Sequence, residues 1–128
     1  MNGVVFDFDG VLADSEGISW DAWADVLAIY GLELHTEDIA ACTGTRSTTT
    51  YDHFAARGDL PPYEAVLEAV DDRRRSRYPT DLRPFSDAVN SVRALAMVGV
   101  PLGVASSSSR ANLDIKMKLL DLARYFEV

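Results

Sequence analysis

The hydrophobic positions divide the chain into two short apolar runs separated by long stretches with helical spacing. Residues 4–8 (Val-Val-Phe-Asp-Phe) form the first run, and Gly10 follows it closely. Residues 101–105 form the second run. Because the first run is rich in β-branched and aromatic residues, it predicts a buried strand of a parallel sheet, and the second short apolar run predicts another strand. Ligands of such open α/β sheets bind where the strands end.

Between and after these runs, apolar residues recur every three or four positions, which is typical of helices. Trp20, Trp23 and Leu27 illustrate the spacing, and Gly31 is the predicted stop of that helix. Capping residues and prolines mark the further helices. We expect these to start at Thr36, to cover about 47–56 and about 63–78, to run from Ser86 to Gly99, and to follow the serines of residues 106–109.

Two carboxylates stand where the first predicted strand ends. Asp7 and Asp9 are separated by one residue, and the chain leaves the strand at Gly10, so the two side chains can converge on one point. Converging carboxylates attract a hard cation, and magnesium prefers one or two of them together with water and phosphate oxygens. In the alternative interpretation, Asp9-Gly10 is only a turn that Asp7 caps. The string Asp-Phe-Asp-Gly of residues 7–10 alone leaves both interpretations open.

The second predicted strand ends in the serine-rich stretch 106–109. A serine run is often flexible low-complexity sequence, but this one lies between a strand and a helix whose apolar face is Leu113, Met117 and Leu120. A hydroxyl group together with backbone N–H groups at the start of a helix forms an anion site. The position of Ser106 therefore favours phosphate binding.

The string from Asp7 to Glu16 (DFDGVLADSE) resembles the first motif of the haloacid dehalogenase-like hydrolase superfamily, in the form of its β-phosphoglucomutase-like branch. Residues 104–108 resemble the second motif of that superfamily. The resemblance implies an α/β fold with a Rossmann-like parallel-sheet core that is incomplete here. Residues 1–14 and 83–128 would form this core, and residues 15–82 would form an inserted helical cap domain.

The resemblance also implies the roles of the site residues. Asp7 would be the nucleophile, and Asp9 the general acid and base. Mg²⁺ would bind the Asp7 carboxylate and the backbone carbonyl of Asp9. Ser106 and the N–H group of Ser107 would bind the phosphoryl group. The chemistry requires two acids, because one carboxylate cannot attack phosphorus and protonate the leaving oxygen at the same time.

The same resemblance implies two further candidate substrate contacts, and the chain differs from the family's pattern at several positions. Gly44 and Arg46 lie in a turn that faces the substrate in the family, although a surface arginine in a helix–helix turn is an equal alternative. Ser19 stands where a histidine is common, which weakens a phosphomutase interpretation. The third-motif lysine and the fourth-motif acids normally come after the last residues of this chain. We therefore expect the front portion of a hydrolase, and its activity as a separate chain is left open.

The lysines of this chain number only two, Lys116 and Lys118, and both follow the second motif. Both lie in the predicted helix after that motif, and the simplest interpretation of both is a solvated helix face. Lys116 is the nearer candidate to substitute for the third-motif lysine.

Composition limits the function classes. The chain has 128 residues, 48% of them hydrophobic, and a net charge of −8, which argues against nucleic acid and acidic membrane surfaces as partners. The single cysteine, Cys42, cannot form an internal disulfide, and no signal-like or membrane-length segment is present, so we expect a cytoplasmic protein.

The predicted function is a magnesium-dependent phosphatase that acts on a small phosphorylated metabolite. The alternatives are a sugar-phosphate phosphomutase and a non-catalytic remnant that binds phosphate or pairs with another chain.

The family's sheet order makes one further prediction. There, a strand from later in the chain covers the outer side of the strand at residues 4–8. Without that neighbour, an apolar strand edge is left exposed and becomes a template for pairing. We therefore expect either a homodimer through this strand or a marginally stable monomer that aggregates.

Overall fold

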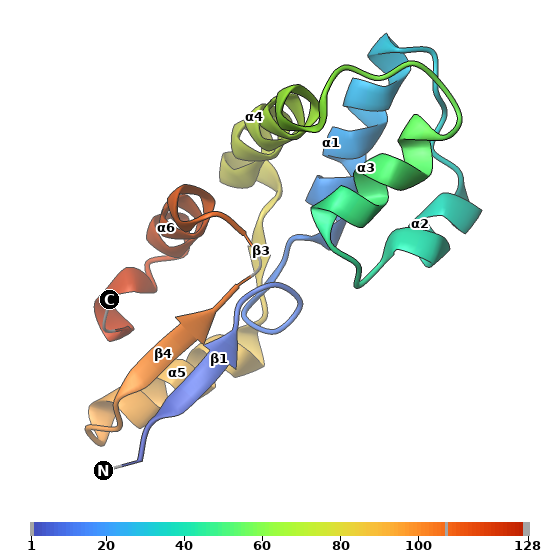
Figure 1. Cartoon of the computed structure of the whole chain (residues 1–128). Coiled ribbons are helices and arrows are strands. Elements are labelled where there is room, and N and C mark those ends of the chain that lie inside the picture. Colours follow the sequence, from blue (N-terminus) through green and yellow to red (C-terminus); the bar gives the residue numbers. More distant parts are fainter. Residues whose placement is uncertain (1, 107, 127–128) are drawn as a thin grey trace. The chain divides into compact units, whose positions relative to one another are not determined.

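The structure is a computed structural model that describes residues 2–106 and 108–126 (Figure 1). It is a mixed α/β fold with a short parallel sheet, as predicted. Contacts divide the chain into two compact units. We call Met1–Gly17 with Arg77–Val128 the core unit, and Ile18–Ser76 the helical unit. The predicted domain boundaries near residues 15 and 82 stay predictions.

The sheet of the core unit is a parallel pair of strands. Strand β1 (Val4–Asp7) pairs with β4 (Leu102–Ala105) in a register that places Asp7 opposite Ala105. Both strands end at the same edge of the sheet (Figure 1). The prediction that residues 4–8 form a buried strand is wrong in its burial, because Val4 is 37% and Val5 71% exposed. In the part of the chain that the structure describes, β4 is the only strand that pairs with β1.

A second, antiparallel pair was not expected from the sequence. Strand β2 (Ala13–Asp14) pairs with β3 (Arg83–Pro84), and the N–H group of Phe85 donates to the carbonyl of Leu12 at 2.9 Å. Each strand is only two residues long, too short for an alternating pattern to predict it. The pair joins the segments that precede α1 and follow α4 within the core unit.

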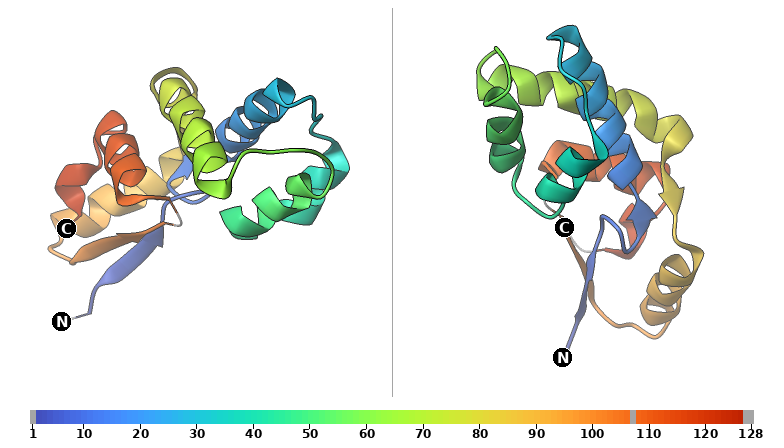
Figure 2. Two further views of the ribbon diagram at one scale, coloured as in Figure 1. Left: turned by 45° about the horizontal axis from the view of Figure 1, so that its top comes forward. Right: turned by 90° about the vertical axis from the view of Figure 1, so that its right-hand side faces the viewer.

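The remaining elements of the core unit are α5 (Ser86–Met97), α6 (Arg110–Leu119) and a 3₁₀ turn, η1 (Ala123–Tyr125). Helix α5 contacts β4 and lies alongside the strand pair in each view (Figures 1 and 2). Gly99 ends the turn after α5 with a φ of 81°, which glycine adopts without steric cost. The apolar interior of the unit includes Phe8, Leu12, Val89, Val92, Leu102, Met117, Leu122 and Phe126.

The helical unit consists of α1 (Glu16–Ile29) from Ile18 onward, α2 (Thr36–Cys42), α3 (Ser47–Ala55) and α4 (Tyr63–Asp81) up to Ser76, and Figure 2 shows these helices as a group. No strand occurs in residues 18–76, all of which are described. The ring of Phe54 is fully buried and stacks on Trp23 with the ring centroids 6.0 Å apart. The buried cluster around them consists of Ala22, Trp23, Val26, Leu27, Phe54, Val66 and Val70.

Helix α2 begins at Thr36 as expected, and the end of α4 differs from the prediction. The N-cap of α2 is His35, whose N–H group donates a hydrogen bond to the carboxylate of Asp38 at 2.9 Å. Helix α4 continues past Pro79 to Asp81. A proline so near the end of a helix removes one backbone hydrogen bond but leaves the following turn intact, and the Leu82 N–H group still bonds to the carbonyl of Tyr78 at 3.2 Å.

Among the described residues, no helix has both the length and the apolar character needed to cross a membrane.

Candidate active site

Asp9 lies in a tight turn at the carboxyl end of β1. The carbonyl of Phe8 accepts hydrogen bonds from the N–H groups of Leu12 and Ala13 at 2.9 and 3.2 Å. Gly10 has a φ of 83°, a conformation that side chains rarely tolerate. The Phe8 ring is fully buried and anchors the turn. The glycine and the buried aromatic residue together fix the direction in which Asp9 leaves the strand.

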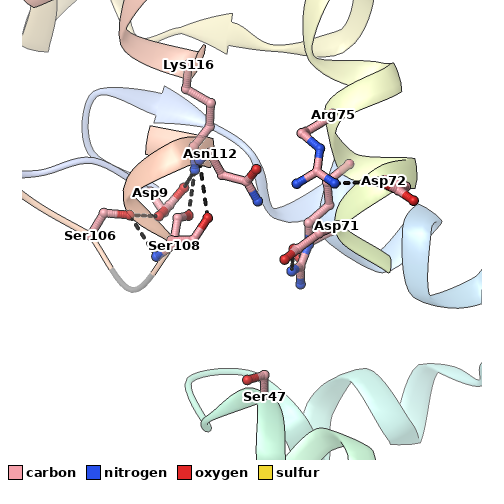
Figure 3. Close-up of polar contacts among 12 residues, drawn as sticks. Asp9, Ser47, Asp71, Asp72, Arg75, Ser106, Ser108, Asn112 and Lys116 are labelled. Carbon is pink, nitrogen blue, oxygen red and sulfur yellow. Dashed lines mark hydrogen bonds and ion pairs between the residues drawn. The ribbon is translucent and has the colours of Figure 1, made fainter. Parts of the chain in front are cut away.

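The carboxylate of Asp9 is held by three side-chain donors. Its Oδ1 atom accepts from Ser15 Oγ at 2.6 Å and from Lys116 Nζ at 2.9 Å. Its Oδ2 atom accepts from Ser106 Oγ at 2.9 Å (Figure 3). Burial alone would raise the pKa of Asp9, but the Ser15 bond, the charge and bond of Lys116 and the Ser106 bond together lower it. Asp9 is therefore an ionised, well-oriented carboxylate.

Ser106 directly follows the last residue of β4. Its Oγ atom accepts a hydrogen bond from the Ser108 N–H group at 3.0 Å while it donates to Asp9. Ser109 caps α6, and its Oγ atom accepts from the Asn112 N–H group at 3.2 Å. The serines described here are thus hydrogen-bonded and do not form a loose linker. Ser107, whose N–H group was predicted to bind phosphate, lies outside the described residues.

Lys116 reaches this network from the second turn of α6. It is 1% exposed, and its Nζ atom also donates to Ser108 Oγ at 2.8 Å. The same ammonium group lies 4.9 Å from the ring centroid of Phe8 and 5.5 Å from that of Tyr78. The prediction of a solvated face is therefore wrong for Lys116, whereas Lys118 is exposed as expected. Lys116 lies one helical turn after Asn112, which is also buried. Two polar residues at this spacing are typical of an exposed helix face, so the sequence offered little indication that Lys116 is buried.

Asp7 ends β1 directly beside Ala105, the residue before Ser106. Its side chain is exposed, and within residues 2–106 and 108–126 no hydrogen bond or ion pair engages its carboxylate. The structure thus brings Asp9 and Ser106 into contact and places Asp7 at the same edge of the sheet. The catalytic roles of these residues stay predictions.

The donor atoms at this edge suit magnesium in chemical type. The Asp7 carboxylate is accessible, whereas both carboxylate oxygens of Asp9 already accept hydrogen bonds, so the backbone carbonyl of Asp9 is the better candidate ligand. No group of three or more His, Cys, Asp or Glu side chains that could hold a metal ion occurs among the described residues. Two oxygen ligands fit magnesium, since it retains several waters or phosphate oxygens in such sites.

Gly44 and Arg46 belong to the helical unit. Gly44 has a φ of 79° in the turn after α2, and Arg46 precedes the first residue of α3 as its N-cap. Both residues are exposed. This conformation agrees with the predicted turn, and their roles as substrate contacts stay predictions.

Comparisons with known proteins identify a family and similar folds. The model of a family described as haloacid dehalogenase-like hydrolase matches residues 4–128. The chain is 26% identical, over 98% of its length, to the fructose-1-phosphate phosphatase YqaB of Escherichia coli, of which it covers 66%. A HAD family hydrolase from Deinococcus radiodurans, solved with bound phosphate and sodium, is 32% identical with a TM-score of 0.67. A HAD hydrolase of family IA, variant 3, from Entamoeba histolytica is 20% identical with a TM-score of 0.85.

Each of these two structures is matched over 99% of this chain. In the opposite direction, the chain covers 56% of the Deinococcus structure and 58% of the Entamoeba structure. It therefore spans less than two thirds of the length of each of these relatives.

Proposed function

Because the chain belongs to the haloacid dehalogenase-like hydrolase family, we propose that it carries the nucleophile and the proton-transfer group of a magnesium-dependent phosphatase. The observation that supports this most strongly is the contact between Asp9 Oδ2 and Ser106 Oγ at 2.9 Å. That contact joins the ends of two adjacent parallel strands, where the first of them also presents the exposed carboxylate of Asp7.

In the proposed reaction, a carboxylate oxygen of Asp7 attacks phosphorus, and the bond between phosphorus and the substrate oxygen breaks. The minor protonated form of Asp9, whose pKa is lowered in this structure, gives its proton to the departing oxygen. The aspartyl-phosphate at Asp7 then reacts with water, whose proton returns to Asp9, and phosphate is released. Magnesium, when bound by Asp7 and the Asp9 carbonyl, would offset the repulsion between carboxylate and phosphoryl group. Ser106 would orient Asp9 and the phosphoryl oxygens.

A small phosphorylated metabolite is the substrate class that we propose. The relative from E. coli is a fructose-1-phosphate phosphatase, and the net charge of −8 disfavours a large polyanion. We also propose a cytoplasmic location, since the one cysteine, Cys42, is a free thiol that is 3% exposed and whose pKa is raised by burial. A homodimer through the outer edge of β1 stays a proposal.

Hydrolysis of 4-nitrophenyl phosphate by this chain, with and without magnesium, tests the proposal. We expect turnover that requires magnesium and that falls by at least about 10³-fold in Asp7→Asn, because the amide is not nucleophilic. Equal rates for the two proteins would overturn the proposal and favour a non-catalytic phosphate-binding module. With a sugar phosphate as substrate, release of inorganic phosphate distinguishes a phosphatase from a phosphomutase, which would return an isomeric sugar phosphate.

A further inference from the structure

Lys116 is an enclosed cation in the core unit. It is 1% exposed, although it lies on a helix whose neighbouring lysine, Lys118, is exposed. Enclosing an ammonium group is unfavourable unless the charge is paired and its N–H groups are bonded. Here the two hydrogen bonds to Asp9 and Ser108 and the faces of two aromatic rings supply that compensation.

The same geometry limits what Lys116 can do. Two of its three N–H groups are used at 2.9 and 2.8 Å, and almost none of its surface is accessible. A phosphoryl group bound at the edge of the sheet would therefore meet Asp9 and Ser106 before it met the ammonium group. Any effect of Lys116 on the reaction must pass through the groups that it holds.

Asp9 is the group on which these contacts converge. The Oδ2 atom is fixed by Ser106, and the Oδ1 atom is shared by Lys116 and Ser15. Of these three donors only Lys116 is charged, so its bond to the carboxylate is the strongest by type. Without it, the Asp9 carboxylate would keep neutral donors only and could rotate about its side-chain bonds.

We infer that Lys116 is a positioning residue that holds the Asp9 carboxylate in the orientation required for proton transfer at the leaving oxygen. This inference rests on the proposed function. Proton transfer is sensitive to placement, since the donor must come within hydrogen-bond reach of the leaving oxygen. A misplaced Asp9 therefore lowers kcat/KM most for those substrates whose leaving group must be protonated.

The leaving group provides the test. An alkyl phosphate releases an alkoxide that must be protonated, whereas 4-nitrophenyl phosphate releases a phenolate that leaves without help. We expect Lys116→Met to lower kcat/KM for the alkyl phosphate by about 10- to 100-fold, and for 4-nitrophenyl phosphate by no more than about threefold. Since kcat/KM reports the steps up to loss of the leaving group, later hydrolysis at Asp7 does not enter the comparison. In an Asp9→Asn background, Lys116→Met should have no further effect on the alkyl phosphate.

Lys118→Met is the matched control, because it removes the same charge from an exposed position on the same helix, and it should leave both substrates unchanged. Equal losses for the two substrates in Lys116→Met, or no loss, would overturn the inference and assign Lys116 a structural role only. The Asp7→Asn variant in the same assay reports separately on the proposed function. If the unmodified chain shows no turnover that depends on Asp7, both proposals are wrong for this chain.

Discussion

Asp38 is a buried acid in helix α2 of the helical unit. It is 5% exposed. Its Oδ1 atom lies 2.8 Å from His53 Nε2, and its Oδ2 atom accepts from Arg57 Nη2 at 3.0 Å and from the His35 N–H group at 2.9 Å. Burial alone would raise the pKa of Asp38, but the His53 bond, the His35 bond and the bond and charge of Arg57 lower it from 3.8 to about 2.

This shift can be converted into a stability difference that depends on pH. A shift from 3.8 to about 2 corresponds to about 2 kcal/mol at about 1.4 kcal/mol per pKa unit. We reduce this to about 1–2 kcal/mol, since the side chains of His53 and Arg57 are 34% and 37% exposed and solvent screens them. Because the folded pKa is the lower one, the stabilisation is complete above about pH 4 and is lost as pH falls toward 2.

Asp38→Asn should therefore lower the free energy of unfolding by about 1–2 kcal/mol at pH 7, and the difference from the unmodified chain should shrink at pH 3. Urea denaturation followed by tryptophan fluorescence is the assay, because Trp20 and Trp23 both lie in α1 and report on the helical unit. Asp52→Asn, at an exposed position in α3, is the control. A loss of stability that is the same at pH 7 and pH 3, or no larger than that of the control, would refute the reasoning.

Two further predictions concern the core unit. Ser106→Ala removes the hydroxyl group that we propose orients the phosphoryl oxygens, together with the bonds to Asp9 Oδ2 and the Ser108 N–H group. Through the lost phosphoryl contact, we expect magnesium-dependent turnover of 4-nitrophenyl phosphate to fall by about 10- to 100-fold with a nearly unchanged melting temperature. Unchanged turnover would contradict the proposed role of Ser106. If β1 pairs with a second copy of the chain through its outer edge, sedimentation should show a dimer that Val5→Lys dissociates, because Val5 is 71% exposed. A monodisperse monomer that melts cooperatively would refute the pairing.

The sequence predicted those features that depend on local pattern. The helical spacing of Trp20, Trp23 and Leu27 and the stop at Gly31 correspond to α1, which ends at Ile29 and is followed by Gly31 at a φ of 75°. The two apolar runs became β1 and β4 in parallel register. The contact between Asp9 and Ser106 could be expected, because residues that end adjacent parallel strands meet at one edge of the sheet.

The position of Lys116 could not be predicted in the same way. Its partner Asp9 is 107 residues away in sequence, and the helical pattern favoured Leu113 and Leu120 as the inward face. A lysine near the surface and a lysine enclosed by two aromatic rings have the same local pattern. Only the tertiary placement of Phe8 and Tyr78 distinguishes them.

The burial of β1 was predicted wrongly for a related reason. Apolar side chains on both faces indicate a strand with other segments packed against both faces. The pattern does not indicate which segments these are. In the part of the chain that the structure describes, one strand pairs with β1, and Val5 remains largely accessible. The two-residue strands β2 and β3 were missed because a bridge of that length has no periodicity.

In the proposed reaction, Asp7 is the residue that accepts the phosphoryl group. Rapid mixing of the chain with magnesium and 4-nitrophenyl phosphate, followed by an acid quench and reduction with borohydride, converts an aspartyl-phosphate into homoserine. Peptide mass spectrometry then locates the modified residue. We expect homoserine at position 7 and none at position 9, and no modification in Asp7→Asn. Magnesium-dependent turnover without homoserine at position 7, or with homoserine at another aspartate, would contradict the claim.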